Sequence, residues 1–337
     1  MVVAERARRN GPLGYDEVIE LALYHPEHGF YETGGGAGKR GDFLTSPEVG
    51  PLFGAVLARA LDSWWRELGE PDPFTVVEAG AGRGALAAAV LGAGPACGPA
   101  LRYVAVERSG ALRAEQPNGV ESAASLPAGP FTGVVLANEL LDNLPFGLLE
   151  RQAEGWAEVR VTDGLAEVLV AVPFGGAPEA DLAPDAPVKG RIPLQRAARA
   201  WIDAAAGLVR PGRVVVIDYA DASPSLARRP WTEWVRTYRG HGRGGHPLAD
   251  LGGQDVTCEV ALDQLPPPTA DRSQADFLRA HGIQDVAARA RRAWDERAHI
   301  GDMEALLARS RVQEAAALTD PSGLGSFRVL EWSFPGF

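Results

Sequence analysis

Residues 74–84 read Phe-Thr-Val-Val-Glu-Ala-Gly-Ala-Gly-Arg-Gly, and this stretch decides the fold. The apolar residues at its start predict a short buried strand, and the Ala- and Leu-rich residues 85–91 that follow predict a helix. Between the two, Gly80, Gly82 and Gly84 predict a tight turn in which a ligand can lie against bare backbone at the helix N-terminus. A strand, a glycine turn and a helix together predict the first unit of an α/β nucleotide-binding fold.

The spacing of the glycines indicates which ligand the turn binds. A dinucleotide-binding turn has the pattern G-x-G-x-x-G, which lets a pyrophosphate sit on the helix N-terminus. Here the pattern is E-x-G-x-G-x-G, with Glu78 before the first glycine. A carboxylate at that point repels a pyrophosphate but can face a sulfonium or an α-ammonium group. We therefore predict that Glu78, Gly80, Ala81, Gly82 and Gly84 bind S-adenosylmethionine (SAM); the alternative is an ordinary glycine-rich turn without a ligand.

The composition of the 337-residue chain narrows the classes of partner. With 44 Asp and Glu against 33 Lys and Arg, the formal net charge is −11, which argues against nonspecific nucleic-acid binding and suits a small molecule or a basic peptide. Cys97 and Cys258 match no disulfide framework and no metal-ligand spacing. Residues 1–10 lack the apolar segment of a secretory signal, and the apolar run 85–93 is too short to span a membrane. We expect a cytoplasmic protein that binds no nucleic acid or membrane, and a homodimer is compatible with the sequence.

The pattern along the chain predicts a parallel sheet covered by helices. Strands are predicted at residues 74–78, 101–107, 131–137, 213–218 and 326–332. Helices are predicted at residues 15–24, 51–68, 85–91, 194–209, 274–281 and 303–318. Near-continuous apolar strands separated by helices are typical of a parallel sheet with both faces buried. Residues 156–161 and 165–172 alternate around Asp163-Gly164, which predicts a β-hairpin that extends the sheet or forms a side ribbon.

These elements suggest four consecutive segments. Residues 1–70 form an N-terminal helical extension with a loop that covers the cofactor. Residues 71–220 form the SAM-binding core and contain the hairpin 156–172. Residues 221–272, which are rich in Gly, Pro, Arg and His, form a substrate-side insertion, and residues 273–337 complete the core.

An acidic residue also ends the second predicted core strand. Glu107 follows Gly84 by 23 residues, where a carboxylate can accept hydrogen bonds from both hydroxyls of a ribose. Arg108 and Ser109 come next and can line the adenine side of the cofactor. The alternative for Glu107 is a solvated acid at the end of a strand.

Polar residues follow the third core strand directly. Asn138 and Glu139 come after an apolar strand, and Asp142 follows Glu139 by three residues, so the two carboxylates can share one helical face. Carboxylates here can clamp a cationic substrate or hold a reacting amine while its proton leaves. The alternative is a helix-capping or helix-dipole role for one of them.

The loop 41–48 carries hydroxyls, carboxylates and a proline, Gly41-Asp42-Phe43-Leu44-Thr45-Ser46-Pro47-Glu48. It can cover bound SAM through Thr45, Ser46, Pro47 and Glu48, or Thr45 or Ser46 can simply cap the next helix. No metal site is predicted, because no compact set of ligands accompanies the loop histidines His25, His28, His241 and His246.

Read together, these motifs resemble the MidA-like SAM-dependent methyltransferases, a family that includes a mitochondrial complex I assembly factor that methylates an arginine. The segments that carry the resemblance are 23–31 (LYHPEHGFY), 41–48 (GDFLTSPE), 53–54 (FG), 77–84 (VEAGAGRG), 137–145 (ANELLDNLP), 217–219 (IDY), 255–257 (DVT), 274–278 (QADFL) and 323–330 (GLGSFRVL). They run in family order from about residue 15 to 332. The resemblance implies a Rossmann-like class I methyltransferase core with an N-terminal helical extension and an inserted substrate-side region. It also implies SAM contacts from the turn 80–84, from Glu107 and from the loop 45–48.

The chain departs from the family pattern in the substrate-side insertion. Residues 220–224 (ADASP) replace a glycine- and aromatic-containing run, residues 242–251 are glycine-rich and short, and residues 258–260 (CEV) replace a His/Asp pattern. These departures leave the SAM motif intact but put the protein-arginine substrate in doubt.

Three functions therefore remain open. The first is methylation of a protein arginine held by Glu139 and Asp142. The second is methylation of a small molecule by an enzyme of the same fold, and the third is a SAM-binding assembly factor with little catalysis. A nicotinamide dehydrogenase is disfavoured by the glycine spacing.

Overall fold

The computed structural model describes residues 2–33, 35, 45–173, 175–240 and 242–335. The chain divides into two compact units, each built from segments distant in the sequence. The first unit comprises residues 1–43, 140–204 and 218–267, and the second comprises residues 44–139, 205–217 and 268–337. The four consecutive segments expected from the sequence do not coincide with these units, because two of the three pieces of the first unit interrupt the core of the second.

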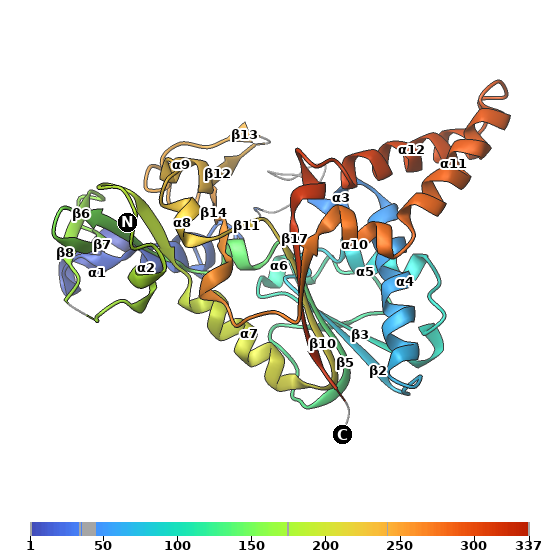
Figure 1. Cartoon of the computed structure of the whole chain (residues 1–337), viewed down its shortest axis with the longest axis horizontal. Helices are drawn as coiled ribbons and strands as arrows, with labels where there is room; N and C mark the ends of the chain where they lie inside the picture. Colours follow the sequence, from blue (N-terminus) through green and yellow to red (C-terminus); the bar gives the residue numbers. More distant parts are fainter. Residues whose placement is uncertain (1, 34, 36–44, 174, 241, 336–337) are drawn as a thin grey trace. The chain divides into compact units, whose positions relative to one another are not determined.

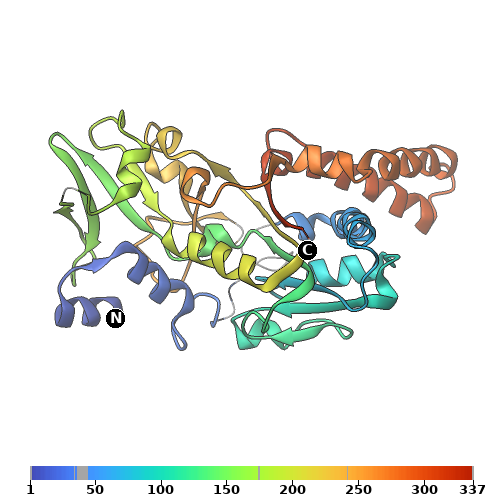
Figure 2. The ribbon, with the colours of Figure 1, turned by 60° about the horizontal axis from the view of Figure 1, so that its bottom comes forward.

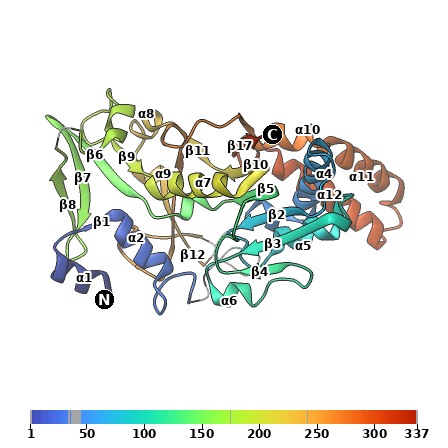
Figure 3. The same ribbon diagram turned by 90° about the horizontal axis from the view of Figure 1, so that it is seen from below.

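The second unit contains a mixed sheet (Figures 1 and 3), in which β10, β5, β2, β3 and β4 are parallel, as the apolar strands predict, and the edge pair β16 and β17 is antiparallel. In the described residues this sheet has the order β16-β17-β10-β5-β2-β3-β4. Its strands are β2 (Phe74–Ala79), β3 (Leu101–Val106), β4 (Glu121–Ala123), β5 (Phe131–Asn138), β10 (Val209–Asp218), β16 (Ala270–Ser273) and β17 (Arg328–Phe334). β2 pairs in parallel with β3 and β5, and β5 pairs in parallel with β10. The five strands predicted from the sequence are thus confirmed, and the short β4 and β16 are additions.

Helices surround this sheet and supply most of its apolar core. They are α3 (Ser46–Val49), α4 (Pro51–Glu67), α5 (Ala85–Gly92), α6 (Gly110–Arg113), α10 (Gln274–Ala280), α11 (Ile283–Arg297) and α12 (Met303–Leu318), with 3-10 turns η1 (Gly98–Ala100) and η5 (Leu324–Ser326). Leu57, Leu61 and Trp64 of α4 are buried in one cluster with Val76 of β2 and Leu86 of α5. Each such side chain contributes about 1.5–3 kcal/mol when it is fully buried.

The long helix α11 of the second unit was not predicted, and neither were the one-turn helices α3 and α6. α11 packs alongside α12, and both appear in orange and red in Figure 2. Only Ile283 and Ala290 of α11 are buried, and most of its other residues are polar or charged. The apolar periodicity on which a helix prediction depends is therefore almost absent. The charged helix α1 (Val2–Asn10) of the first unit was also not predicted. It buries only Val3 and Ala7, so it too lacks a clear apolar periodicity.

The first unit is a mixture of short helices and small sheets, which are antiparallel except for the parallel pair β11 and β15. Its helices are α1, α2 (Tyr15–Tyr24), α8 (Ser223–Leu226) and α9 (Trp231–Trp234), with 3-10 turns η2 (Leu141–Asn143), η3 (Pro178–Leu182) and η4 (Leu262–Gln264). Its strands are β1 (Leu13–Gly14), β6 (Gly147–Gln152), β7 (Gly155–Val161), β8 (Glu167–Ala171), β9 (Arg191–Leu194), β11 (Ala220–Asp221), β12 (Val235–Arg239), β13 (Gly242–Arg243), β14 (Asp255–Cys258) and β15 (Val260–Ala261). The helix α7 (Arg196–Leu208) runs from the first unit into the second.

The predicted hairpin exists, but it does not extend the parallel sheet. β7 and β8 pair antiparallel across the turn at Asp163-Gly164, as the alternation predicts. β7 also pairs with β6 and β1, and β6 pairs with β9, so the hairpin belongs to a separate antiparallel sheet. The side strands β6 and β9 were not recognised in the sequence.

The chain leaves the parallel sheet twice at neighbouring strand ends. It passes into the first unit after Glu139, which follows β5, and again after Ile217 near the end of β10. Because β5 and β10 are adjacent and parallel, both exits lie at the carboxyl edge of the sheet, where open α/β sheets bind their ligands. None of the helices in the described part of the chain is long and apolar enough to cross a membrane.

Candidate active site

The glycine turn has the backbone shape that its sequence predicts. Gly80, Gly82 and Gly84 have φ angles of 72°, 51° and 79°, a left-handed region that side chains with a Cβ rarely adopt. Gly84 N–H donates to the Ala81 carbonyl at 2.7 Å, and Gly84 is the N-cap residue of α5. A Cβ at Gly84 would lie 2.5 Å from Cδ of Pro117, whereas a Cβ at Gly82 would meet no atom within 4 Å. The backbone at Gly82 therefore borders open space, as a ligand-binding turn requires.

Glu107 joins this turn through its carboxylate. Gly82 N–H donates to Oε2 at 3.0 Å, and Ser109 N–H donates to Oε1 at 2.8 Å. Burial raises the pKa of Glu107, while the hydrogen bonds from Ser109 and Gly82 oppose that shift. Glu107 is thus a fixed acceptor beside the turn and not a solvated acid. Each oxygen keeps a lone pair, so the residues present fit a vicinal diol next to the Gly82 backbone.

Glu78, the acid before the glycines, is buried and bonded inside the protein. Tyr103 O–H donates to its Oε2 at 2.6 Å. Burial raises the pKa of Glu78 to about 7, although the hydrogen bonds from Tyr103 and from the Ala87 backbone in α5 oppose the shift. Glu78 is therefore only partly ionised at neutral pH in the free protein. Its contact with the cationic part of SAM stays a prediction, and a ligand cation would favour its charged form.

The two residues after Glu107 have local roles. The Ser109 hydroxyl accepts from Leu112 N–H at 3.4 Å and so caps the short helix α6. Arg108 is exposed, and its carbonyl accepts from Arg113. The prediction that Arg108 and Ser109 line the adenine side remains a prediction, and for Ser109 the capping bond accounts for the buried hydroxyl.

The loop that was predicted to cover the cofactor is partly described. Gly41, Asp42, Phe43 and Leu44 lie outside the described residues. Thr45 stands at the N-cap position of α3, which contains Ser46, Pro47 and Glu48, but its side chain makes no capping hydrogen bond. The predicted side-chain cap from Thr45 or Ser46 is therefore wrong, since Ser46 Oγ instead donates to Gln274 Oε1 at 3.1 Å.

The acceptor at the start of α3 comes from Glu139. Ser46 N–H donates to Glu139 Oε1 at 3.1 Å, and Asn138 Nδ2 donates to the same oxygen at 3.1 Å. Glu139 has a φ of 50°, which is uncommon for a residue with a side chain and often marks a functional position. Its N–H donates to the Ile217 carbonyl at 2.8 Å, which ties it to β10. Glu139 thus joins two strand ends to the segment 45–48.

The expectation that Glu139 and Asp142 share a helical face is wrong. Glu139 is in the left-handed region and precedes the 3-10 turn η2, which begins only at Leu141. The N–H groups of Leu141 and Asp142 donate to Asp218 Oδ2 at 3.0 and 3.3 Å. Asp218, at the end of β10, therefore performs the capping role that the sequence left open for Asp142.

Asp142 instead lies within a buried polar cluster of the first unit. Tyr219 O–H donates to Asp142 Oδ2, and the guanidinium of Arg236 lies 5.3 Å from the centre of the Tyr219 ring. Asp142 is 3% exposed, and its Oδ1 has no hydrogen-bond partner among the described residues. Burial raises the pKa of Asp142 to about 6.

Asp255 completes this cluster, and it was missing from the predicted site. Tyr31 O–H and Asn143 Nδ2 donate to Asp255 Oδ1 at 3.0 and 3.1 Å. Burial, followed by the charge of Asp142, raises the pKa of Asp255 to about 7. The available signal was the segment 255–257, which carries part of the family resemblance although it follows no catalytic spacing.

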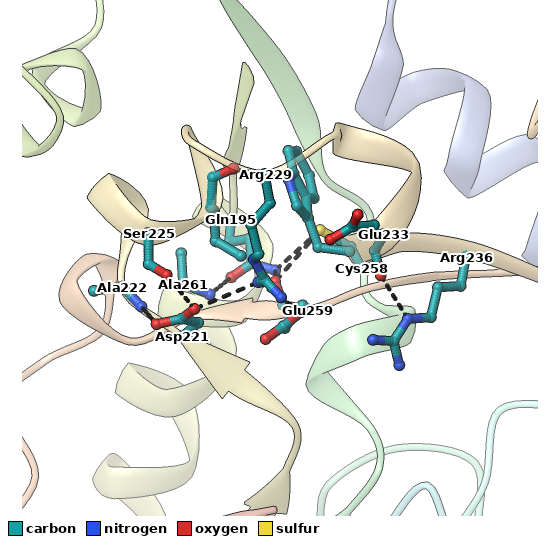
Figure 4. A network of polar contacts seen from close by, with 12 residues as sticks. Gln195, Asp221, Ala222, Ser225, Arg229, Glu233, Arg236, Cys258, Glu259 and Ala261 are labelled. Carbon is teal, nitrogen blue, oxygen red and sulfur yellow. Dashed lines mark hydrogen bonds and ion pairs between the residues drawn. The ribbon is translucent and has the colours of Figure 1, made fainter. Parts of the chain in front are cut away.

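Asp221, Cys258 and Glu259 are among the residues that depart from the family pattern, and they lie in the polar network drawn in Figure 4. Arg229 pairs with Glu259 at 2.9 Å and with Asp221 at 3.4 Å. Ser225 O–H donates to Asp221 at 2.6 Å, and Gln195 Nε2 donates to the Glu259 carbonyl at 3.1 Å. Asp221, Cys258 and Glu259 therefore bind Arg229, Ser225 and Gln195, which lie outside the altered segments, and these contacts support the fold of the first unit.

No group of three or more His, Cys, Asp or Glu side chains that could hold a metal ion occurs in the described part of the chain. His25 and His28 stack on each other at 5.1 Å, and His246 packs against Trp231. His241 lies outside the described residues.

Comparison with known proteins identifies the family. Residues 56–281 match the model of a family of S-adenosyl-L-methionine-dependent methyltransferases. The chain belongs to this family. The methyltransferase is 30% identical to a candidate methyl transferase from Burkholderia thailandensis, whose crystal structure holds S-adenosylhomocysteine. The TM-score is 0.83 over 98% of this chain and 90% of that one. A second structure from the same organism gives 31% identity and a TM-score of 0.81, again over 98% and 90% of the two chains.

Curated relatives of the methyltransferase are mitochondrial protein arginine methyltransferases. The NDUFAF7 homolog of Drosophila melanogaster is 43% identical over 81 residues, which is 24% of this chain and 18% of that protein. NDUFAF7 of Danio rerio is 28% identical over 193 residues, which is 47% of this chain and 45% of that protein. The matched stretches thus span less than half the length of these relatives. The predicted MidA-like family, α/β methyltransferase fold and SAM cofactor are confirmed.

Proposed function

We propose that this methyltransferase transfers the methyl group of SAM to an arginine side chain of a protein. The curated relatives that it matches are named protein arginine methyltransferases. Asp142 is the structural observation that carries the proposal. It is a buried carboxylate without an ion-pair partner among the described residues, and it follows the β5 strand end by four residues. A guanidinium is the cation best matched to such an acceptor, because its planar fork of donors suits carboxylate oxygens.

The residues of the second unit would hold the cofactor. The turn 80–84 offers its backbone, and Glu107 offers both carboxylate oxygens to the ribose. When bound, SAM supplies a methyl group on a positively charged sulfur whose departure leaves a neutral thioether. Glu139 would position the segment 45–48 through its bond to Ser46, and we retain Thr45, Pro47 and Glu48 as proposed cofactor neighbours.

The acceptor needs a group that takes a proton. A guanidinium that gains a methyl group on nitrogen must lose one N–H proton to keep a single positive charge. A carboxylate with a pKa near neutrality can accept that proton and release it to solvent after each turnover. Asp142, whose pKa burial raises to about 6, suits this task, and Asn138 and Glu139 are proposed to orient the acceptor.

The direct test is transfer of label from methyl-tritiated SAM into proteins of a host lysate. After acid hydrolysis of the protein fraction, we expect label in methylarginine. Label in the small-molecule fraction would instead support the alternative of small-molecule methylation. SAM binding without any transfer would support an assembly factor. Gly84→Ala, which disturbs the cofactor turn, is the control for cofactor-dependent label.

The altered insertion is the feature of the chain that favours a small-molecule acceptor. Asp221, Glu259 and Cys258 lie in the network of Figure 4, where they bind Arg229, Ser225 and Gln195. Tyr219 and Asp255, which border these altered residues in the sequence, keep the family pattern and contact other partners. These contacts favour the arginine proposal. A cytoplasmic location and a homodimer stay predictions from the sequence.

A further inference from the structure

Two buried carboxylates of the first unit lack a cation. Asp142 and Asp255 are 3% and 0% exposed, and neither has an Arg, Lys or His nitrogen within 4.0 Å among the described residues. Asp142 accepts from Tyr219, and Asp255 accepts from Tyr31 and Asn143, so every side-chain donor to the pair is neutral. Buried acids in proteins are nearly always paired with a cation or fully hydrogen-bonded.

Each carboxylate also has one oxygen without a partner. Asp142 Oδ1 and Asp255 Oδ2 are inaccessible to solvent and receive no hydrogen bond from the described residues. A neighbouring side chain links the two acids. Asn143 follows Asp142 directly in the sequence and donates to the other oxygen of Asp255, Oδ1. An unpartnered buried charge is costly, so these two oxygens require either a ligand or a shared proton.

The remaining side chains of the cluster are arranged to hold the two acids and not to neutralise them. The charge of Arg236 lowers the pKa of Asp142, but the Arg236 Nε donates to the Glu233 carbonyl at 2.7 Å and its guanidinium faces the Tyr219 ring. Tyr24 O–H donates to the Asn143 carbonyl at 3.1 Å, and its ring stacks on Tyr31 at 5.6 Å between centroids. Two aromatic side chains, Tyr31 and Tyr219, therefore flank the pair. Flat rings beside paired carboxylates suit a planar cation.

We propose that Asp142 and Asp255 together bind the guanidinium of the acceptor arginine, with Asp142 Oδ1 and Asp255 Oδ2 as its two acceptors. This inference rests on the proposed function and adds Asp255 to it as a substrate-binding residue. Tyr31 and Tyr219 are positioning residues that orient the two carboxylates. Glu139, whose Oε1 accepts from Ser46 and Asn138, keeps the roles proposed for it above.

The competing explanation is a proton shared between the two acids. Burial raises the pKa of both acids, and the charge of Asp142 raises the pKa of Asp255 further, so a shared proton would satisfy both oxygens without any ligand. Asp255→Asn distinguishes the two explanations. An amide at this position can donate to Asp142 and so replaces a shared proton, but it cannot pair two carboxylates with a guanidinium.

The test compares Asp255→Asn and Asp142→Asn with wild type and with Asp263→Asn. Asp263 is a matched control in the first unit, because its carboxylate accepts from Ser223 N–H and O–H and lacks no partner. We expect methylarginine formation in the lysate assay to fall at least 100-fold in both test variants. S-adenosylhomocysteine affinity, measured by calorimetry, should stay within twofold. Asp263→Asn should keep its turnover per folded molecule.

Each failure has its own signature. Normal methylarginine formation by Asp255→Asn would overturn the inference while the proposed function stands. If wild type forms no methylarginine, the proposed function fails, and binding of acetylarginine amide to the S-adenosylhomocysteine complex decides the inference separately. The inference survives only if that binding, followed by NMR, is present in wild type and Asp263→Asn and lost in the two test variants. Absent binding in wild type, or equal binding in all four proteins, would overturn it.

Discussion

The glycine turn of the second unit and the acidic pair of the first unit are built in opposite ways. The turn is continuous in sequence, and its three glycines and Glu107 come from two adjacent βα connections. The acidic pair consists of Asp142 and Asp255, which accept hydrogen bonds from Tyr219 and Tyr31. These four residues come from four segments up to 224 residues apart. The turn offers backbone and hydrogen-bond acceptors in a preset shape, whereas the pair offers charge that the described residues leave uncompensated. The turn is therefore preset to bind the cofactor, and the acidic pair is proposed to bind a cation.

Removing the charge of the acidic pair tests the difference between the two sites most directly. Burial raises the pKa of Asp255 from 3.8 to about 7, so folding favours the protonated acid, and the native state binds more protons than the unfolded state between these pH values. The stability of wild type should therefore fall as pH rises from about 4 to 7. Asp255→Asn removes this effect. We expect it to be more stable than wild type above pH 7, by roughly 4 kcal/mol, and to lose that advantage near pH 4.

Urea unfolding at pH 4, 6 and 8 measures the difference, with Asp263→Asn as the control. Asp263 accepts three hydrogen bonds from Ser223, so its replacement should destabilise the protein. If Asp255→Asn were also destabilising at pH 8, Asp255 would be a structural residue and the contrast with the turn would disappear.

We expect a substitution in the glycine turn to weaken SAM binding through steric overlap and not through a change of charge. In Gly84→Ala, the new Cβ meets Pro117 at 2.5 Å in a backbone with a φ of 79°. We expect SAM affinity to fall roughly 30-fold, which equals about 2 kcal/mol. Calorimetry with SAM measures this loss. Gly94→Ala is the matched control, because Gly94 also has a positive φ of 65° but lies after α5 with no atom near its Cβ. Equal loss in both variants would mean that backbone strain alone, and not the shape of the turn, was measured.

The same contrast explains what the sequence could predict. Residues 74–84 form a strand, turn and helix in one run, so local propensities alone revealed the turn, its glycines and the parallel sheet. Glu107 was found because a strand end has a regular position after the glycines. Asp255, Tyr31 and Tyr219 have no mutual spacing, and only the packed first unit brings them to Asp142. The sequence did not show that Glu139 lies outside the turn η2. A left-handed backbone is uncommon for a glutamate and could not be inferred from its identity.

Positioning within the pair should have a smaller effect on turnover than its charge. Tyr219→Phe removes the hydroxyl that donates to Asp142 and leaves the ring beneath Arg236. That hydrogen bond lowers the pKa of Asp142, so its loss should move the acid limb of the kcat profile to higher pH. We expect kcat to fall about tenfold at pH 7 with SAM affinity unchanged, as is common for one hydrogen bond to a charged group. A kcat loss of similar size without any shift of the acid limb would contradict the positioning role.

Conversely, the smallest effect we expect is on the cofactor side, through the ionisation of Glu78. The pKa of this buried acid is raised to about 7 in the free protein, and a cationic ligand beside it would favour the carboxylate. Binding of SAM would then release a proton, and affinity should rise about fourfold between pH 6.5 and 8 before it levels off. Glu78→Gln, which keeps an acceptor for Tyr103 but cannot ionise, should remove the pH dependence. Calorimetry in buffers of different ionisation enthalpy measures the released proton directly. If affinity is flat across this range in wild type, Glu78 does not sense the charge of the cofactor, and its role is to anchor Tyr103 and the start of α5.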